Sequence, residues 1–227
     1  MAGHIGMDIE TLQYQDRHQA GKFLATKLAY LAHRKDVVVL ALPRGGVPVG
    51  FEIAKALGVP LDVFVVRKLG VPGHAELAMG AIASGGVSLL NEDVVQSLGI
   101  SPAMIRKAAA EEERELARRE RAYRNGRPPI DVEGRTIILV DDGLATGSSM
   151  LVAVRALKRK KPAQIIVAVP VASPATCAQF EPEADQVICA FTPEPFWAVG
   201  QWYRDFSQTS DEEVRDLLTK SAAPRAA

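Results

Sequence analysis

A pair of adjacent carboxylates followed by a small, hydroxyl-rich loop is the part of this 227-residue chain best suited to chemistry. Asp141 and Asp142 end an apolar run, 137–140, whose lack of alternation predicts a parallel strand buried on both faces. The loop that follows can bind a phosphate, because it combines a flexible glycine with hydroxyl groups and leads into a predicted helix. Its residues are Ala145, Thr146, Gly147, Ser148 and Ser149. Carboxylates repel a phosphate but accept hydrogen bonds from hydroxyl groups. The sequence therefore predicts a sugar phosphate site.

Two further loops supply cations and glycine amides, and each follows a predicted strand: Arg44-Gly45-Gly46 after 37–42, and Arg67-Lys68 after 61–66. Because the strands of a parallel sheet all point the same way, both loops and the acid pair are expected at one sheet edge. The fitting ligand is a sugar with a phosphate at each end, accompanied by a divalent ion that offsets the repulsion.

The elements that must position these residues alternate between helix and strand, which predicts an α/β protein with a parallel sheet and helices on both faces. Helices are expected over 16–33, 47–57, 101–124, 174–180 and 210–219, with one more beginning near Ser148; strands are expected over 37–42, 61–66, 136–140, 164–169 and 186–191. Residues 67–74 are expected to form a mobile segment that returns as short strands between 79 and 90. The charged helix 101–124 is interpreted as solvated, lying lightly on the domain or at a subunit contact, with Glu115–Arg119 and Glu120–Arg124 pairs.

Composition narrows the class of partner. Lys plus Arg and Asp plus Glu are each 27, so zero net charge gives no global attraction to nucleic acid or an anionic membrane. The absence of a signal peptide pattern and of a long apolar segment predicts a cytoplasmic protein without a membrane partner. Cys177 and Cys189 are expected to be small buried hydrophobes, since no His cluster accompanies them.

Residues 137–149 resemble the fingerprint of the type I phosphoribosyltransferases, which use 5-phosphoribosyl 1-diphosphate (PRPP): a hydrophobic strand, two acids, and then a loop containing Ala-Thr-Gly. The segment 42–46 resembles the family's pyrophosphate loop, and Arg67-Lys68 resembles the basic start of its flexible catalytic loop. Together with 70–77, these motifs are most similar to a bacterial subgroup of predicted phosphoribosyltransferases. The resemblance covers roughly residues 15–215.

The resemblance implies a single domain over 1–227, with a core at about 15–190, a flexible loop and a C-terminal hood at about 191–220. It implies transfer of the phosphoribosyl group from PRPP to a nitrogenous base, with release of pyrophosphate, as in nucleotide salvage. A homodimer is a further expectation. Mg²⁺ is the implied cofactor, held mainly by PRPP with help from Asp141 and Asp142 rather than by a protein cage.

Each motif then has an implied role. Asp141 and Asp142 would bind the ribose hydroxyls and stabilise the developing oxocarbenium ion, and 145–149 would bind the 5′-phosphate. Arg44, Gly45, Gly46, Arg67 and Lys68 would bind pyrophosphate, with Arg44 and Lys68 also counted as catalytic. A non-proline cis peptide bond is expected at Arg44-Gly45.

The acceptor base is less well specified. Ala145 stands where hypoxanthine-guanine enzymes often place an Asp, and Gly143 replaces a branched apolar residue, which would loosen the start of the loop. The aromatic tail offers candidates for base binding in Phe196 and Trp197, followed by Asp205, although these rings could equally pack the last helix. His74 is either a proton donor in the loop or an exposed polar residue.

Other functions compete with the transferase. A PRPP- or nucleotide-sensing regulator could keep this fold without turnover, although the retained pyrophosphate loop and Arg67-Lys68 favour catalysis. A P-loop enzyme is disfavoured because Gly-x-x-x-x-Gly-Lys-Ser/Thr is absent from the sequence. A two-acid phosphatase is disfavoured because its acids are normally separated by one residue.

Overall fold

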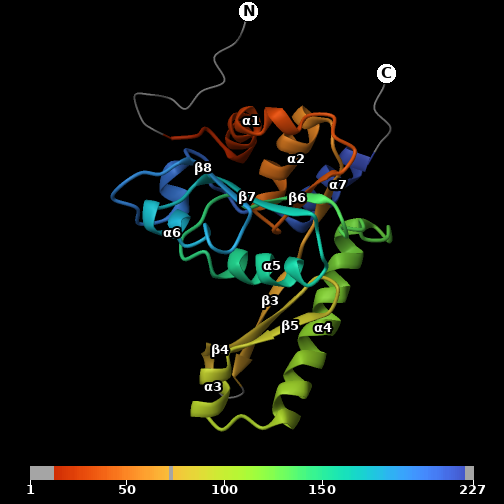
Figure 1. The fold of residues 1–227 in the computed structure, drawn as a ribbon, viewed down its shortest axis with the longest axis vertical. Coiled ribbons are helices and arrows are strands. Elements are labelled where there is room, and N and C mark those ends of the chain that lie inside the picture. The colour runs from red at the N-terminus through yellow and green to blue at the C-terminus, as the bar shows by residue number, and fades with distance from the viewer. Residues whose placement is uncertain (1–12, 72–73, 223–227) are drawn as a thin grey trace, which may run out of the picture.

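A five-stranded parallel sheet forms the centre of the computed structural model, which describes residues 13–71 and 74–222, with side chains omitted for 74–76 (Figure 1). Its strands are β1 (Val37–Ala41), β2 (Leu61–Val63), β6 (Thr136–Val140), β7 (Gln164–Val171) and β8 (Gln186–Phe191), in the order β2-β1-β6-β7-β8. Every pairing is parallel, and Val38 lies opposite Ile137, which lies opposite Ile165. The predicted α/β class is confirmed.

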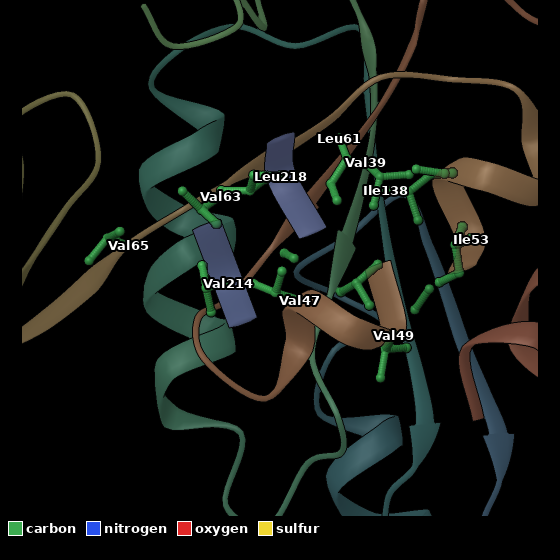
Figure 2. Close-up of a cluster of buried hydrophobic side chains, with 14 of the residues drawn as sticks. Val39, Val47, Val49, Ile53, Leu61, Val63, Val65, Ile138, Val214 and Leu218 are labelled. Carbon is green, nitrogen blue, oxygen red and sulfur yellow. The ribbon is translucent and has the colours of Figure 1, made fainter. Parts of the chain in front are cut away.

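Helices cover both faces of this sheet because side chains along each buried strand alternate between two apolar layers. On one face, Val39 and Ile138 pack with α1 (Arg17–Lys27), α2 (Gly46–Leu57) and α7 (Asp211–Ala222), as Figure 2 shows for α2 and α7. On the other face, Val38 and Ile137 pack with α5 (Ser148–Lys158) and with residues around α6 (Pro174–Ala178).

Local signals fix the ends of the first two helices. The backbone N–H of Gln19 donates to the Asp16 carboxylate over 2.7 Å, which caps α1, and a 3₁₀ turn, η1 (Ala29–Leu31), follows it. Helix α2 stops at Gly58, whose φ of 74° is easily reached only without a side chain. The helix predicted at 47–57 is therefore confirmed. The helix predicted at 16–33 was too long, because α1 ends at Lys27 and only η1 follows it.

A projecting arm replaces the mobile loop that the sequence predicts after Val66. Strands β3 (Val66–Val71), β4 (His74–Ala83) and β5 (Val87–Leu90) form a separate antiparallel sheet, followed by α3 (Glu92–Ser97) and α4 (Pro102–Arg124). The arm extends away from the parallel sheet, and α4 runs back along it (Figure 1). Because β2 ends at Val63, the predicted strand 61–66 was too long. The expectation that Arg67 and Lys68 lie in a loop was wrong, because both belong to β3.

Helix α4 is anchored more firmly than a solvated helix would be. The Arg124 side chain is only 7% exposed, and its Nε donates to Asp62 over 2.8 Å while Nη2 donates to the Val63 carbonyl over 3.0 Å. Glu120 lies 3.2 Å from the same guanidinium. A buried, fully paired arginine therefore ties the carboxyl end of α4 to β2.

The chain after β8 folds back over the edge of the sheet. It contains a 3₁₀ turn, η2 (Val199–Trp202), and its Trp202 and Tyr203 pack with Tyr14 and Val171. The two cysteines differ from expectation, since Cys177 and Cys189 are half-buried and joined as a disulfide between α6 and β8. Within the described ranges, no helix has the length and apolar character needed to cross a bilayer.

Candidate functional site

The acid pair lies at the carboxyl end of β6, and the loop between β1 and α2 packs directly against it. A side chain at Gly45 would collide with the Asp142 carboxylate, and a Cβ at Gly46 would lie 2.8 Å from the Val140 carbonyl oxygen. Both glycines are therefore required for this approach. The loop does contain a non-proline cis peptide bond, but it is Pro43–Arg44, one bond earlier than predicted.

The two carboxylates are held in distinct ways. The Asp142 N–H donates to Oδ1 of Asp141 over 2.8 Å, whereas Oδ2 of Asp142 accepts from Nε of Arg17 over 2.8 Å. Burial, and then the charge of Asp142, raise the pKa of Asp141 well above its ordinary value. Burial also raises the pKa of Asp142, while Arg17 opposes that rise. Asp142 is therefore the carboxylate that ionises more readily.

Arg17 and Tyr203 complete this environment. Arg17 was not predicted for the site, and Tyr203 was expected only as one of the aromatic tail rings that could stack on a base. Nη1 of Arg17 donates to the Ser207 carbonyl over 2.7 Å, and its guanidinium carbon lies 3.9 Å from the centre of the Phe206 ring. Oη of Tyr203 donates to the Asp142 carbonyl over 2.6 Å. Tyr203 and Phe206 belong to the aromatic tail seen in the sequence, but no local pattern distinguishes Arg17.

The phosphate loop candidate leads directly into α5, as predicted. Gly147, with a φ of 69°, precedes the first helical residue, Ser148, whose hydroxyl lies 3.1 Å from that of Thr146. The carbonyl of Ala145 accepts from the Thr176 hydroxyl over 3.0 Å, which supports the loop from behind. Thr146, Ser148 and Ser149 are exposed. The amino end of α5 is thus open to an anion.

The cations of the predicted site are only partly brought together. Nη1 of Arg44 is 3.8 Å from the carboxylate of Asp211, which also accepts from Oη of Tyr123 over 2.9 Å. Lys68 lines a groove of about 550 Å³ together with Ser148 and Ser149, so it borders the phosphate loop.

Arg67 lies elsewhere. Consecutive strand residues point to opposite faces, and Arg67 is ion-paired with Glu112 of α4. The expected convergence of three loops is wrong for this residue, although it holds for the loops after β1 and β6.

The candidates for base binding have different surroundings. Phe196 stacks on Trp202 at 6.2 Å between ring centres, Trp197 is 81% exposed, and the carboxylate of Asp205 accepts from the Ser207 N–H over 2.9 Å. The side chain of His74 lies outside the description.

The structure explains why position 143 is a glycine, and the explanation differs from the one inferred from the sequence. A Cβ there would lie 2.6 Å from Cγ1 of Val199 and 3.0 Å from Cγ1 of Val171. The glycine therefore allows the chain after β8 to pack beside the acid pair, instead of loosening the loop.

Oxygen ligands suited to Mg²⁺ are present in Asp141 and Asp142, and Mg²⁺ commonly uses one or two carboxylates together with substrate phosphates. Within residues 13–71 and 74–222, no group of three or more His, Cys, Asp or Glu side chains is arranged to hold a metal ion. The donor set thus fits an ion that would be shared with a phosphorylated ligand.

Comparison with known proteins points to one family. The model of the phosphoribosyl transferase domain matches residues 75–200. A Mycobacterium tuberculosis protein named "Putative phosphoribosyl transferase" is 47% identical over 208 residues, which are 92% of this chain but 47% of that protein. The chain thus spans about half the length of the curated relatives it matches.

Solved structures show the same fold. The crystal structure of TT1426 from Thermus thermophilus is 40% identical, with a TM-score of 0.80, and the match covers 93% of this chain and 100% of that one. A hypothetical protein from Neisseria gonorrhoeae, solved with bound ppGpp, is 15% identical with a TM-score of 0.51, covering 92% and 94% of the two chains, and is similar in fold alone.

Proposed function

We propose a reaction for this chain on the premise that it belongs to the phosphoribosyl transferase family. The chain would transfer the 5-phosphoribosyl group of PRPP to a nitrogenous base and release pyrophosphate. The observation that carries this proposal is the packing of Gly45 and Gly46 against Asp141 and Asp142. This packing supports the proposal, because a ligand with phosphates at both ends would need its pyrophosphate loop to lie beside the ribose-binding acids.

Each half of the site has a part in this reaction. The open amino end of α5, with Thr146, Ser148 and Ser149, would bind the 5′-phosphate. Asp142, whose ionised form is favoured by its hydrogen bond from Arg17, would accept a hydrogen bond from a ribose hydroxyl and stabilise positive charge at the anomeric carbon. Asp141 would hold the second hydroxyl.

Pyrophosphate would leave toward Arg44 and the amides of Gly45 and Gly46. Lys68, which borders the phosphate loop on the arm, would add a further cation. A bound Mg²⁺ would neutralise part of the pyrophosphate charge. The base would enter beside the chain that follows β8, where Phe196, Trp197 and Asp205 lie, and this segment would act as the hood.

A pyrophosphate release assay tests the proposal. Purified protein would be mixed with PRPP and Mg²⁺ and offered adenine, guanine, hypoxanthine, xanthine, uracil and orotate in turn. At least one base should stimulate pyrophosphate release, and Arg44→Gln should reduce that rate. PRPP binding without release for any base would instead support the sensing regulator. Absence of PRPP binding would exclude both the transferase and a sensor of PRPP.

A further inference from the structure

A second cavity is lined by residues near the carboxyl ends of α4 and α5 and in the turn between β4 and β5. These parts of the chain lie at the opposite end of α5 from Ser148, and their elements can be followed in Figure 1. Its volume is about 280 Å³. None of its lining residues belongs to the acid pair, the Arg44 loop or the phosphate loop. The cavity is therefore separate from the site of the proposed transfer reaction.

Positive charge predominates in its lining. Four cationic side chains and two acidic ones face the cavity: Arg121, Arg124, Arg127, Lys160, Asp62 and Glu120. Arg124 forms ion pairs with both of these acids, Asp62 and Glu120. In the part of the chain that the structure describes, no carboxylate lies within ion-pair distance of Arg121, Arg127 or Lys160. The lining thus carries about two uncompensated positive charges at neutral pH.

The three remaining cations are placed at the wall. The ammonium group of Lys160 sits against Gly85, since any side chain at that glycine would collide with it. Nε of Arg121 donates to the Ala117 carbonyl over 3.2 Å, and Nε of Arg127 donates to the Arg124 carbonyl over 3.1 Å. These bonds fix each guanidinium but use one of its five N–H donors, which leaves the forked ends for a ligand.

Apolar side chains make up much of the remaining wall: Leu40, Val63, Phe64, Ile130 and Val132. An apolar wall with a few convergent polar groups is typical of sites for small organic ligands. Basic residues at the carboxyl ends of α4 and α5 could serve only to complement the helix dipoles. That role would not explain an apolar cavity between them.

We propose that this cavity binds a small phosphate monoester, with its phosphate on Arg121, Arg127 and Lys160 and its organic part against the apolar wall. A phosphate monoester carries about −1.5 to −2 charges at neutral pH, which matches the uncompensated charge better than a carboxylate does. Arginine forks also match phosphate geometry. This site is additional to the proposed transferase function and does not depend on it.

The test uses phenyl phosphate as the probe, with inorganic phosphate and phenol as its separate parts. Backbone amide NMR shifts would follow binding, because Gly85 reports on the cavity and Gly147 on the phosphate loop. Phenyl phosphate should shift the Gly85 amide signal until the site is saturated. Its apparent Kd should be lower than that of inorganic phosphate or phenol. Arg121→Gln with Lys160→Gln should weaken binding at Gly85 at least about tenfold, since each loses a charge-assisted hydrogen bond, and should leave the response of Gly147 unchanged.

Arg114→Gln is the matched control, because Arg114 is exposed on the same helix and does not line the cavity. It should bind like the wild type. Lys160→Gln alone provides a milder variant if the double variant folds poorly. The proposal is overturned if Gly85 does not respond, if its response survives both substitutions, or if inorganic phosphate binds there as tightly as phenyl phosphate.

Discussion

Replacing Arg17 by Gln tests whether the cation on α1 keeps Asp142 ionised. The two side chains are 11% and 15% exposed, and Nε of Arg17 donates to Oδ2 of Asp142 over 2.8 Å. A hydrogen bond of this charged kind contributes about 1.5 to 3 kcal/mol. We expect Arg17→Gln to lower the free energy of unfolding by about 2 kcal/mol near pH 8, which corresponds to a Tm about 4 to 8 °C lower for a chain of this size.

The effect should depend on pH with a defined sign. Burial raises the pKa of Asp142 in the folded state above its ordinary value. The free energy of unfolding therefore falls as pH rises and the buried carboxyl group ionises. Removing Arg17 removes the group that opposes the rise, and the pKa of Asp142 should increase further. The stability difference between wild type and variant should therefore be largest at alkaline pH and shrink as pH falls and Asp142 becomes protonated in both proteins.

Urea denaturation between about pH 8 and pH 5 measures this difference, and a double-mutant cycle isolates the interaction. The cycle combines Arg17→Gln with Asp142→Asn and should give a coupling energy of about 2 kcal/mol at the upper pH. Arg17→Lys should retain part of the coupling, because it keeps the charge but loses the planar group above Phe206. A coupling energy below about 0.5 kcal/mol, or one independent of pH, would refute this reasoning.

Three further substitutions follow from the packing. Gly143→Val should cost about 1 to 3 kcal/mol in the free energy of unfolding because its side chain meets Val199, and urea midpoints would show an unchanged value if this packing is wrong. Asp62→Asn should lower the free energy of unfolding by about 3 kcal/mol in the same measurement, because it weakens a partner of the buried Arg124. A loss below about 1 kcal/mol, as found for exposed ion pairs, would contradict the anchoring of α4. Asp211→Asn should tighten binding of magnesium pyrophosphate up to about fivefold in calorimetry because it frees Arg44, and weaker binding would show that Asp211 assists instead.

The sequence predicted those parts of the site that depend on local pattern. The apolar run at 136–140, the acids after it and the helix beginning at Ser148 all lie within one short segment, and each has a signal within a few residues. The glycines at 45 and 46 were singled out only as amide donors to pyrophosphate, and their close approach to the acid pair emerged from the structure.

Features that depend on contacts distant in sequence were missed. Arg17 lies 125 residues from Asp142, and nothing near it indicates an acidic partner. The short strands expected between 79 and 90 are present as part of β4 and as β5, but β3 was missed. Its antiparallel pairing with β4 is set by tertiary contacts, and the polar pair Arg67-Lys68 gave that strand the appearance of a loop. Gly143 was misread for a similar reason, since Val199 lies far along the chain.

Calorimetric titration of PRPP with Mg²⁺ tests the central claim most directly. Wild-type protein should bind, and Asp141→Asn with Asp142→Asn should raise the Kd at least about tenfold, because the ribose hydroxyls lose charged acceptors. Asp36→Asn is the matched control, since Asp36 is exposed in a surface pair with Arg34, and it should bind like the wild type. Equal affinity in the wild type and the double variant would contradict the assignment of this acid pair to ribose.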